Sequence, residues 1–168
     1  MFREDHFKKA ASILETCKSK RLKVSCAESC TGGLLAALLT EIPGSSAVFE
    51  GGFVSYSNMM KQLFLNVRSD SLEEYGAVSE RVAMEMAAHC RSVTKTSIAI
   101  GITGIAGPEG GTTDKPVGLV YIAVSTPNHA EVKRHVFKGN RSEVRLQAVE
   151  HALTMIESAL ATSFSSFA

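Results

Sequence analysis

The chain has 168 residues, of which 45% are hydrophobic and 21% charged, and its formal net charge is +1. This length and composition are typical of one globular domain, which we expect to span residues 1–168. The basic residues are scattered along the chain rather than clustered. The sequence therefore argues against a nucleic-acid partner and against binding to an anionic membrane surface.

The amino end mixes acidic and basic residues and lacks the apolar segment of a signal peptide. The longest apolar run, "LLAALL" at residues 34–39, is far shorter than the roughly 20 residues that a membrane-spanning helix needs. We therefore expect a cytoplasmic protein. The four cysteines form no CxxC pair and should be free thiols in that reducing compartment.

The first part of the chain predicts helices alternating with strands. Apolar residues at helical spacing indicate a helix over residues 4–18. The segment "LKVSCA" at 22–27 predicts a short strand, and residues 31–40 predict a helix that the following "IPG" ends. Residues 47–57 are rich in Val, Phe and Tyr and predict a strand with a kink or bulge at Gly51-Gly52.

The middle of the chain predicts three helices in a row. The first covers residues 58–65, with Asn58 as its cap and Asn66 at its end, where Asn tolerates the left-handed conformation. A short capped helical turn follows at 69–76. Residues 79–93 form a clear amphipathic pattern, which Ser79 caps.

The last part predicts most of the sheet. Residues 96–104 form a nearly continuous apolar strand, as expected at the centre of a sheet, and a long Gly/Pro loop follows. Residues 117–125 and 130–137 predict a hairpin, and a final helix runs from about residue 140 to 160. This order predicts an α/β fold: a three-layer α/β/α sandwich whose mixed sheet is mostly parallel, with one strand reversed by the hairpin.

Three loops carry more polar and small residues than a turn requires, and the first is "ESCTGG" after the strand at 22–27. Thr31 would cap the following helix, while Gly32 and Gly33 would let a ligand approach its free N–H groups. A helix start of this kind suits a phosphate. The alternative is an ordinary capped helix, since the segment is neither a Walker loop nor a dinucleotide fingerprint.

The second loop, "PGSS", precedes the strand at 47–57, and Lys61 follows that strand. A serine such as Ser46 becomes a nucleophile if a base takes its proton, and a lysine serves as that base when burial keeps it partly neutral. Solvated lysines and turn serines are more common, so residue types alone give this pairing little weight.

The third loop, "GITGIAGPEGGTTDKPVG", is long for a compact domain, and such loops are usually functional. Thr103 and Gly104 leave the central strand at its carboxyl end, where α/β sheets bind ligands. Two cations that open the last helix on one face, Arg141 and Arg145, are further candidates for a phosphate, although such residues are more often solvated.

The remaining reactive side chains give weaker signals. The histidines form no metal-binding pattern, and Cys26 and Cys30 lack a second pair, so we expect no metal site. Cys30 is nevertheless a rival nucleophile, because a thiol at a helix start has a lowered pKa.

The three loops, together with Lys61 and "YGAVSE", resemble the CinA carboxy-terminal domain family over essentially the whole chain. Asn66, where many relatives have Gly, and Met59-Met60 are departures that leave the site intact. The resemblance implies an amidohydrolase that converts nicotinamide mononucleotide to nicotinic acid mononucleotide and ammonia without a cofactor. It also implies a homo-oligomer.

Carried over by position, the resemblance makes Ser46 the nucleophile, Lys61 its base and Ser29 a proton relay, with Tyr56 as a further polar member. The remaining candidates would bind the nucleotide substrate, and they are Glu28, Thr31, Gly32, Gly33, Asn58, Thr103, Gly104 and Arg145. Two alternatives remain open at this point: a nucleotide-binding module without catalysis, and a DNA-acting protein, which the near-neutral charge opposes.

Overall fold

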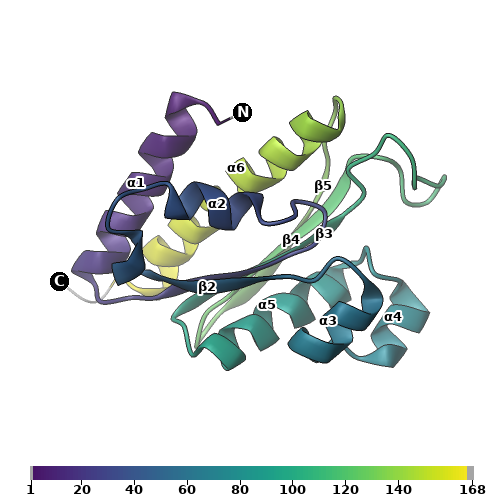
Figure 1. Cartoon of the computed structure of the whole chain (residues 1–168). Coiled ribbons are helices and arrows are strands. Elements are labelled where there is room, and N and C mark those ends of the chain that lie inside the picture. The colour runs from purple at the N-terminus through teal and green to yellow at the C-terminus, as the bar shows by residue number, and fades with distance from the viewer. Residues whose placement is uncertain (1, 166–168) are drawn as a thin grey trace.

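The computed structural model describes residues 2–165 and contains a five-stranded sheet between two layers of helices (Figure 1). The first layer consists of α1 (Glu4–Ser19), α2 (Leu34–Thr40) and α6 (Arg141–Ser163). The opposite layer consists of α3 (Asn58–Leu65), α4 (Ser69–Tyr75) and α5 (Glu80–Thr94). The predicted α/β/α sandwich is therefore confirmed.

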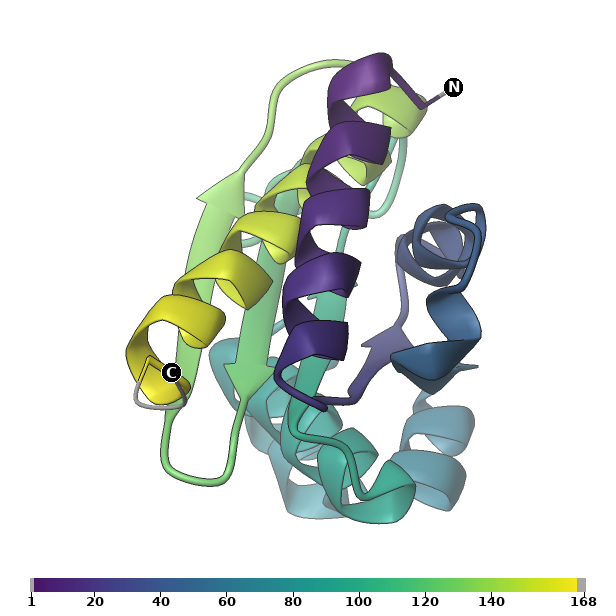
Figure 2. The ribbon, with the colours of Figure 1, turned by 90° about the vertical axis from the view of Figure 1, so that its left-hand side faces the viewer.

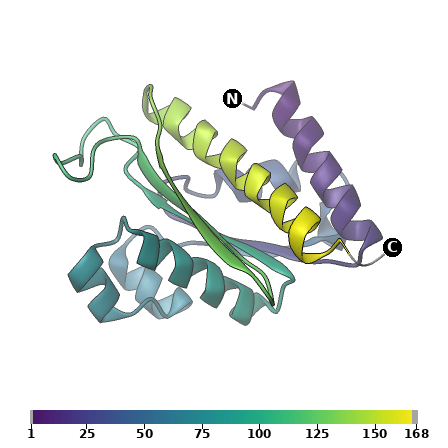
Figure 3. The ribbon, with the colours of Figure 1, turned by 180° about the vertical axis from the view of Figure 1, so that it is seen from behind.

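The sheet has the strand order β2-β1-β3-β4-β5. Its strands are β1 (Val24–Glu28), β2 (Phe49–Val54), β3 (Ile98–Gly104), β4 (Leu119–Ser125) and β5 (Ala130–Val136). β1 pairs parallel with both β2 and β3, whereas β4 pairs antiparallel with both β3 and β5. One strand, β4, thus runs against the other four, as the predicted hairpin requires, and the hairpin lies against α6 (Figure 3).

The two faces of the sheet are packed differently. On one face α6 lies across β3 and β4 with a row of buried apolar side chains, and α1 runs beside it (Figure 2). On the other face α5 approaches β3 closely through Ala83 and Ala87. A Cβ atom at Gly101 would lie 2.4 Å from the Ala83 carbonyl oxygen and 2.7 Å from the Ala87 nitrogen. The glycine is what lets the helix backbone lie this near to the strand.

The irregular edge strand occurs where the sequence predicts it. Between Phe49 and Gly51 the register of β2 against β1 skips one residue. A Cβ atom at Gly52 would lie 2.7 Å from the Cys26 sulfur, so the strand passes close to β1 here. The predicted kink at the glycine pair is confirmed.

The helix ends that position the site follow local sequence signals, with one correction. Asn66 ends α3 with a φ of 46°, and Ser79 caps α5, both as expected. Asn58 is not the cap of α3, because the Ser57 hydroxyl accepts the hydrogen bond from the Met60 N–H. Asn58 is instead the first, exposed residue of the helix. Within residues 2–165 we find no helix with the length and apolar character needed to cross a membrane.

Candidate active site

A cavity of about 240 Å³ opens at the carboxyl ends of β1 and β3. Ser29 and Cys30, which follow β1, form part of its wall, and Tyr56 and Lys61, which follow β2, form another part. The end of β3 and the loop after it close the cavity over residues 103–107. Because β1, β2 and β3 are parallel, their carboxyl ends meet at one edge of the sheet, and segments far apart in sequence line one hollow.

Lys61 is the most unusual side chain of this cavity, because it is a lysine with only 1% of its surface exposed. Its Nζ donates to Ser29 Oγ at 3.0 Å, to the Ser55 carbonyl at 2.9 Å and to the Tyr56 carbonyl at 3.4 Å. Among residues 2–165 no carboxylate forms an ion pair with it. Burial lowers the pKa of the Lys61 amine below its ordinary value, and the nearby Cys30 sulfur opposes this effect.

Ser29, which accepts this hydrogen bond from Lys61, is fixed through its own backbone. Its N–H donates to the Ile102 carbonyl at 2.9 Å, which extends the pairing of β1 with β3 by one residue. The side chain is 8% exposed and lies on the cavity wall. A hydroxyl at 3.0 Å from an amine whose pKa is lowered by burial has the geometry of a serine with its general base.

The start of α2 is occupied by a protein carboxylate, which corrects the expected phosphate site. Glu28 is 1% exposed, and its two carboxylate oxygens accept from the N–H groups of Gly33, Leu35 and Ala36 at 3.0, 3.2 and 2.9 Å. Glu28 therefore serves as the helix cap rather than as a substrate ligand. The N–H of Gly33 is not available to a phosphate, and the helix dipole is already matched by a negative charge.

Thr31 and Arg145 also have structural roles in place of the expected ones. Thr31 does not cap α2, because its hydroxyl is buried and makes no hydrogen bond in the described part of the chain. Its carbonyl accepts from the Arg145 guanidinium at 2.7 Å. A Cβ atom at Gly32, which has a φ of 60°, would lie 3.5 Å from the same guanidinium. Arg145 thus fixes the loop after β1 and does not line the cavity.

Ser46 lies at the opposite end of the sheet from Lys61. It is an exposed residue of the 3-10 helix Ser45–Ala47, which precedes β2, whereas Lys61 follows β2. A strand of this length spans roughly 20 Å at about 3.3 Å per residue. Within a single chain the expected pairing of Ser46 with Lys61 is therefore wrong, and the hydroxyl beside the amine belongs to Ser29.

Comparison with known proteins identifies the family. The model of the CinA C-terminal domain matches residues 6–160. The chain belongs to the CinA C-terminal domain family. It is 51% identical over 147 residues to a CinA-like protein of Syntrophomonas wolfei, covering 88% of this chain and 34% of that protein. The chain thus spans about a third of the length of the curated relatives it matches.

Solved CinA structures cover nearly the whole domain. The crystal structure of competence/damage inducible protein CihA from Agrobacterium tumefaciens superposes with a TM-score of 0.92 at 41% identity, over 94% of this chain and 97% of that one. A CinA superfamily protein from Klebsiella pneumoniae gives 0.89 at 33% identity, over 93% and 98%. The relatives share the fold of this CinA domain throughout.

Further residues line the cavity of this CinA domain. Among the residues predicted for the site, Tyr56, Thr103 and Gly104 line it, whereas Asn58 does not. The Thr103 hydroxyl donates to the Ala77 carbonyl at 2.7 Å, so it fixes the neighbouring wall. Arg141 also lines the cavity, and its guanidinium donates to the Tyr56 hydroxyl and to the Gly107 carbonyl, each at 2.9 Å.

Arg141 is the functional candidate to which the sequence reasoning gave too little weight. It stands at the first position of α6, beside the Asn140 cap, while Arg145 lies one turn further along the helix. The first turn of α6 faces the carboxyl ends of the parallel strands, so its first residue reaches the cavity. The sequence signal that could have found Arg141 was its place directly after the predicted helix cap Asn140.

Cys30 lies in the cavity but is poorly suited to be a nucleophile. Burial raises the pKa of its thiol to about 12, an effect that the positive charges of Lys61 and Arg145 only partly oppose. The thiol therefore stays protonated near neutral pH. As for metal ligands, no three His, Cys, Asp or Glu side chains within residues 2–165 lie close enough together to hold an ion.

A larger hollow of about 540 Å³ lies on the α5 side of the sheet, lined by Tyr75, Arg81, Lys115 and Tyr121 among others. Among its lining residues there is no pairing of a hydroxyl with a buried base. The two hollows share Val78 as a common wall residue, and the smaller one is the stronger candidate for an active site.

Proposed function

We propose that this CinA domain is an amidohydrolase that converts nicotinamide mononucleotide to nicotinic acid mononucleotide and ammonia. The observation that carries the proposal is the buried Lys61 amine at 3.0 Å from Ser29 Oγ. We assign Ser29 as the nucleophile and Lys61 as its general base. An amide is a poor electrophile, so it needs an activated oxygen and a proton donor for its leaving nitrogen, and this pair can supply both.

In the first half of the reaction the neutral Lys61 amine takes the Ser29 proton as Oγ attacks the carboxamide carbon. The amine becomes an ammonium group, and the carbonyl oxygen becomes an oxyanion. The ammonium then protonates the amide nitrogen, the C–N bond breaks, and ammonia leaves an acyl ester on Ser29. In the second half Lys61 takes a proton from water as the water oxygen attacks the ester, and it returns a proton to Ser29 Oγ as the ester C–O bond breaks and the carboxylic acid leaves.

Backbone donors near Ser29 are suited to hold the oxyanion. Within residues 2–165 the Cys30 N–H donates to no other backbone group, and Cys30 lines the cavity. The N–H of the residue after a nucleophile is a common oxyanion donor. Such a donor contributes about 3–4 kcal/mol in comparable sites.

Arg141 is suited to the phosphate of the nucleotide. Its guanidinium stands on the cavity wall and is anchored by the neutral oxygens of Gly107 and Tyr56, and no carboxylate within residues 2–165 forms an ion pair with it, although Glu109 lines the same cavity. Guanidinium groups bind phosphate oxygens through directed hydrogen bonds. In this arrangement Arg141 would fix the distal end of the substrate while Ser29 and Lys61 act on the carboxamide.

The test is ammonia release from nicotinamide mononucleotide by the purified protein. We expect turnover by the wild type and a loss of about 10³-fold in Ser29→Ala and in Lys61→Arg, since an arginine does not give up its proton. Ser46→Ala and Cys30→Ala serve as controls and should stay within roughly threefold of wild type. Full activity of Ser29→Ala would overturn the assigned mechanism. Binding of the nucleotide without any ammonia release would show a binding module instead.

A further inference from the structure

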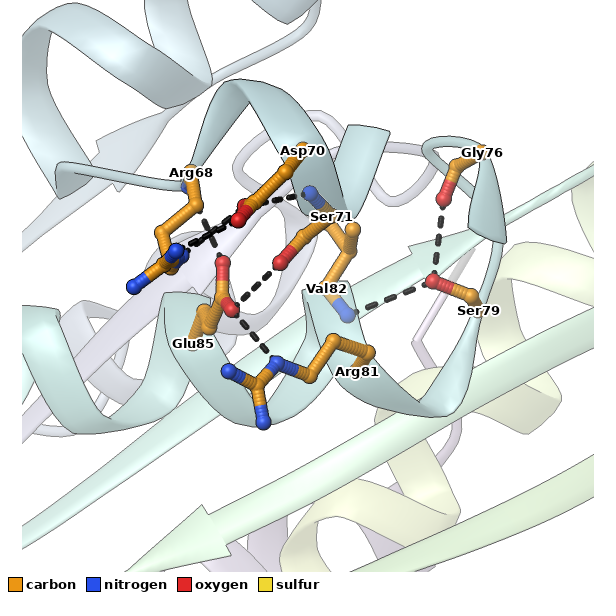
Figure 4. A network of polar contacts seen from close by, with 8 residues as sticks. All are labelled: Arg68, Asp70, Ser71, Gly76, Ser79, Arg81, Val82 and Glu85. Carbon is orange, nitrogen blue, oxygen red and sulfur yellow. Dashed lines mark hydrogen bonds and ion pairs between the residues drawn. The ribbon is translucent and has the colours of Figure 1, made fainter. Parts of the chain in front are cut away.

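Glu85 is a buried carboxylate outside the cavity that joins two separate segments of the chain. It lies in the second turn of α5 with 8% of its surface exposed. Its oxygens accept from the Ser71 hydroxyl at 2.7 Å, the Arg81 Nε at 2.7 Å and the Arg68 N–H at 3.0 Å (Figure 4). Two of these donors belong to the start of α4 and the residue before it, so Glu85 docks that segment onto α5.

The segment that Glu85 holds is continuous with the end of α3. Arg68 follows Val67, and the Val67 N–H donates to the Lys61 carbonyl at 3.1 Å. Val67 is itself buried in one apolar cluster with Leu65 and with the α5 residue Val82. The backbone of Lys61 is thus linked to Glu85 through two consecutive residues, Val67 and Arg68, and each of these two residues contacts α5.

The other end of α4 leads to the cavity wall. Ser79 accepts from the Val82 N–H and donates to the Gly76 carbonyl, which closes the turn between α4 and α5 (Figure 4). Ala77 and Val78, inside this turn, line the cavity. Residues 68–79 therefore form a strap across α5 that begins at the end of α3 and finishes at the cavity wall.

We propose that Glu85 is a positioning residue that holds the Lys61 amine against Ser29 by docking this strap onto α5. The proposal rests on the assigned roles of Ser29 and Lys61. In Glu85→Gln one of the two accepting oxygens becomes an NH₂ group, which faces a donor instead of accepting from it, so the strap loosens from α5. The end of α3 is then free to shift, and water reaches the amine.

The experiment is a titration of the Lys61 amine by ¹³C NMR of lysine-labelled protein, with the resonance assigned by its loss in Lys61→Met. In Glu85→Gln we expect the pKa of Lys61 to rise toward the ordinary lysine value, because solvation favours the charged form. A direct electrostatic role of Glu85 predicts the opposite sign, since removing a negative charge lowers the pKa of an amine. If Glu85→Gln does not fold, Ser71→Ala replaces it as the test variant. Ser71→Ala removes one of the three hydrogen bonds and should give a smaller rise in the pKa of Lys61.

Two controls separate positioning from general destabilisation. Glu80→Gln changes an exposed acid on the same helix and should leave the Lys61 titration unchanged. Val149→Ala weakens the core on the α6 side and should lower the melting temperature without moving the Lys61 pKa. An unchanged or lowered Lys61 pKa in folded Glu85→Gln overturns the proposal.

A second readout addresses the reaction itself. If the domain hydrolyses nicotinamide mononucleotide, kcat in Glu85→Gln should fall at least about tenfold at neutral pH, with KM nearly unchanged, since small misplacements of reacting groups have large effects. A raised KM with an unchanged kcat would contradict a role of Glu85 in positioning the base. Absence of activity in the wild type would refute the proposed function, while the Lys61 titration would still decide the role of Glu85.

Discussion

Replacing Glu28 by alanine tests how much the fold depends on the carboxylate beneath the site. The substitution removes the acceptor for three backbone N–H groups, those of Gly33, Leu35 and Ala36. A buried donor left without a partner costs about 1–3 kcal/mol, and the environments of Gly33 and Ala36 are only partly buried. We therefore expect Glu28→Ala to lower the free energy of unfolding by about 3–5 kcal/mol, a large share of the roughly 5–15 kcal/mol typical of a domain.

The measurement is urea-induced unfolding followed by circular dichroism. Glu28→Gln should give an intermediate loss, because its amide oxygen still accepts but its NH₂ group faces other donors. The matched control is Glu50→Ala, which removes an exposed carboxylate that pairs with Lys23 at 3.4 Å and should cost less than about 1 kcal/mol. A loss below about 1 kcal/mol in Glu28→Ala would refute the capping argument.

Three further predictions concern the amine, the phosphate contact and the packing of α5. Folded Lys61 releases its proton at a lower pH than unfolded Lys61, because burial lowers its pKa. The wild type should therefore gain stability relative to Lys61→Met as the pH rises from neutral toward the ordinary lysine pKa. Parallel urea titrations of both proteins across that pH range check the sign. Arg141→Gln should raise KM for nicotinamide mononucleotide about tenfold with kcat nearly unchanged, and an unchanged KM would remove Arg141 from the phosphate site. Gly101→Ala should destabilise the domain by about 3 kcal/mol, since its Cβ would meet the α5 backbone; an unaffected melting temperature would contradict this packing.

The fold was largely predictable from the sequence, because its signals are local and agree with one another. The apolar run of β3 marked the centre of the sheet, and the hairpin after it required one reversed strand. Three local signals each matched a feature of the backbone: Ser79 the start of α5, Asn66 the end of α3, and the Gly51-Gly52 pair the bulge of β2. Helix-cap residues adjacent to one another, such as Ser57 and Asn58, were harder to separate, since both side chains are able to cap.

The site was predictable only in part, because a motif does not state which end of a strand it occupies. Ser29 and Lys61 both follow parallel strands, so the topology brings them together. Ser46 precedes β2, and the resemblance gave it a role that the single chain does not allow. Glu28 was misjudged for another reason: its partners are backbone N–H groups, which leave no trace in the side-chain sequence.

The chain order of the cavity wall has a consequence for engineering. The hydroxyl and the amine both come from the first 61 residues, while the facing wall comes from the loop after β3 and from the start of α6. The groups that would break a bond and those that would select a ligand are therefore encoded in separate stretches of the gene. Libraries confined to residues 105–116 would vary the wall that faces Ser29 and Lys61 and leave those two side chains unchanged.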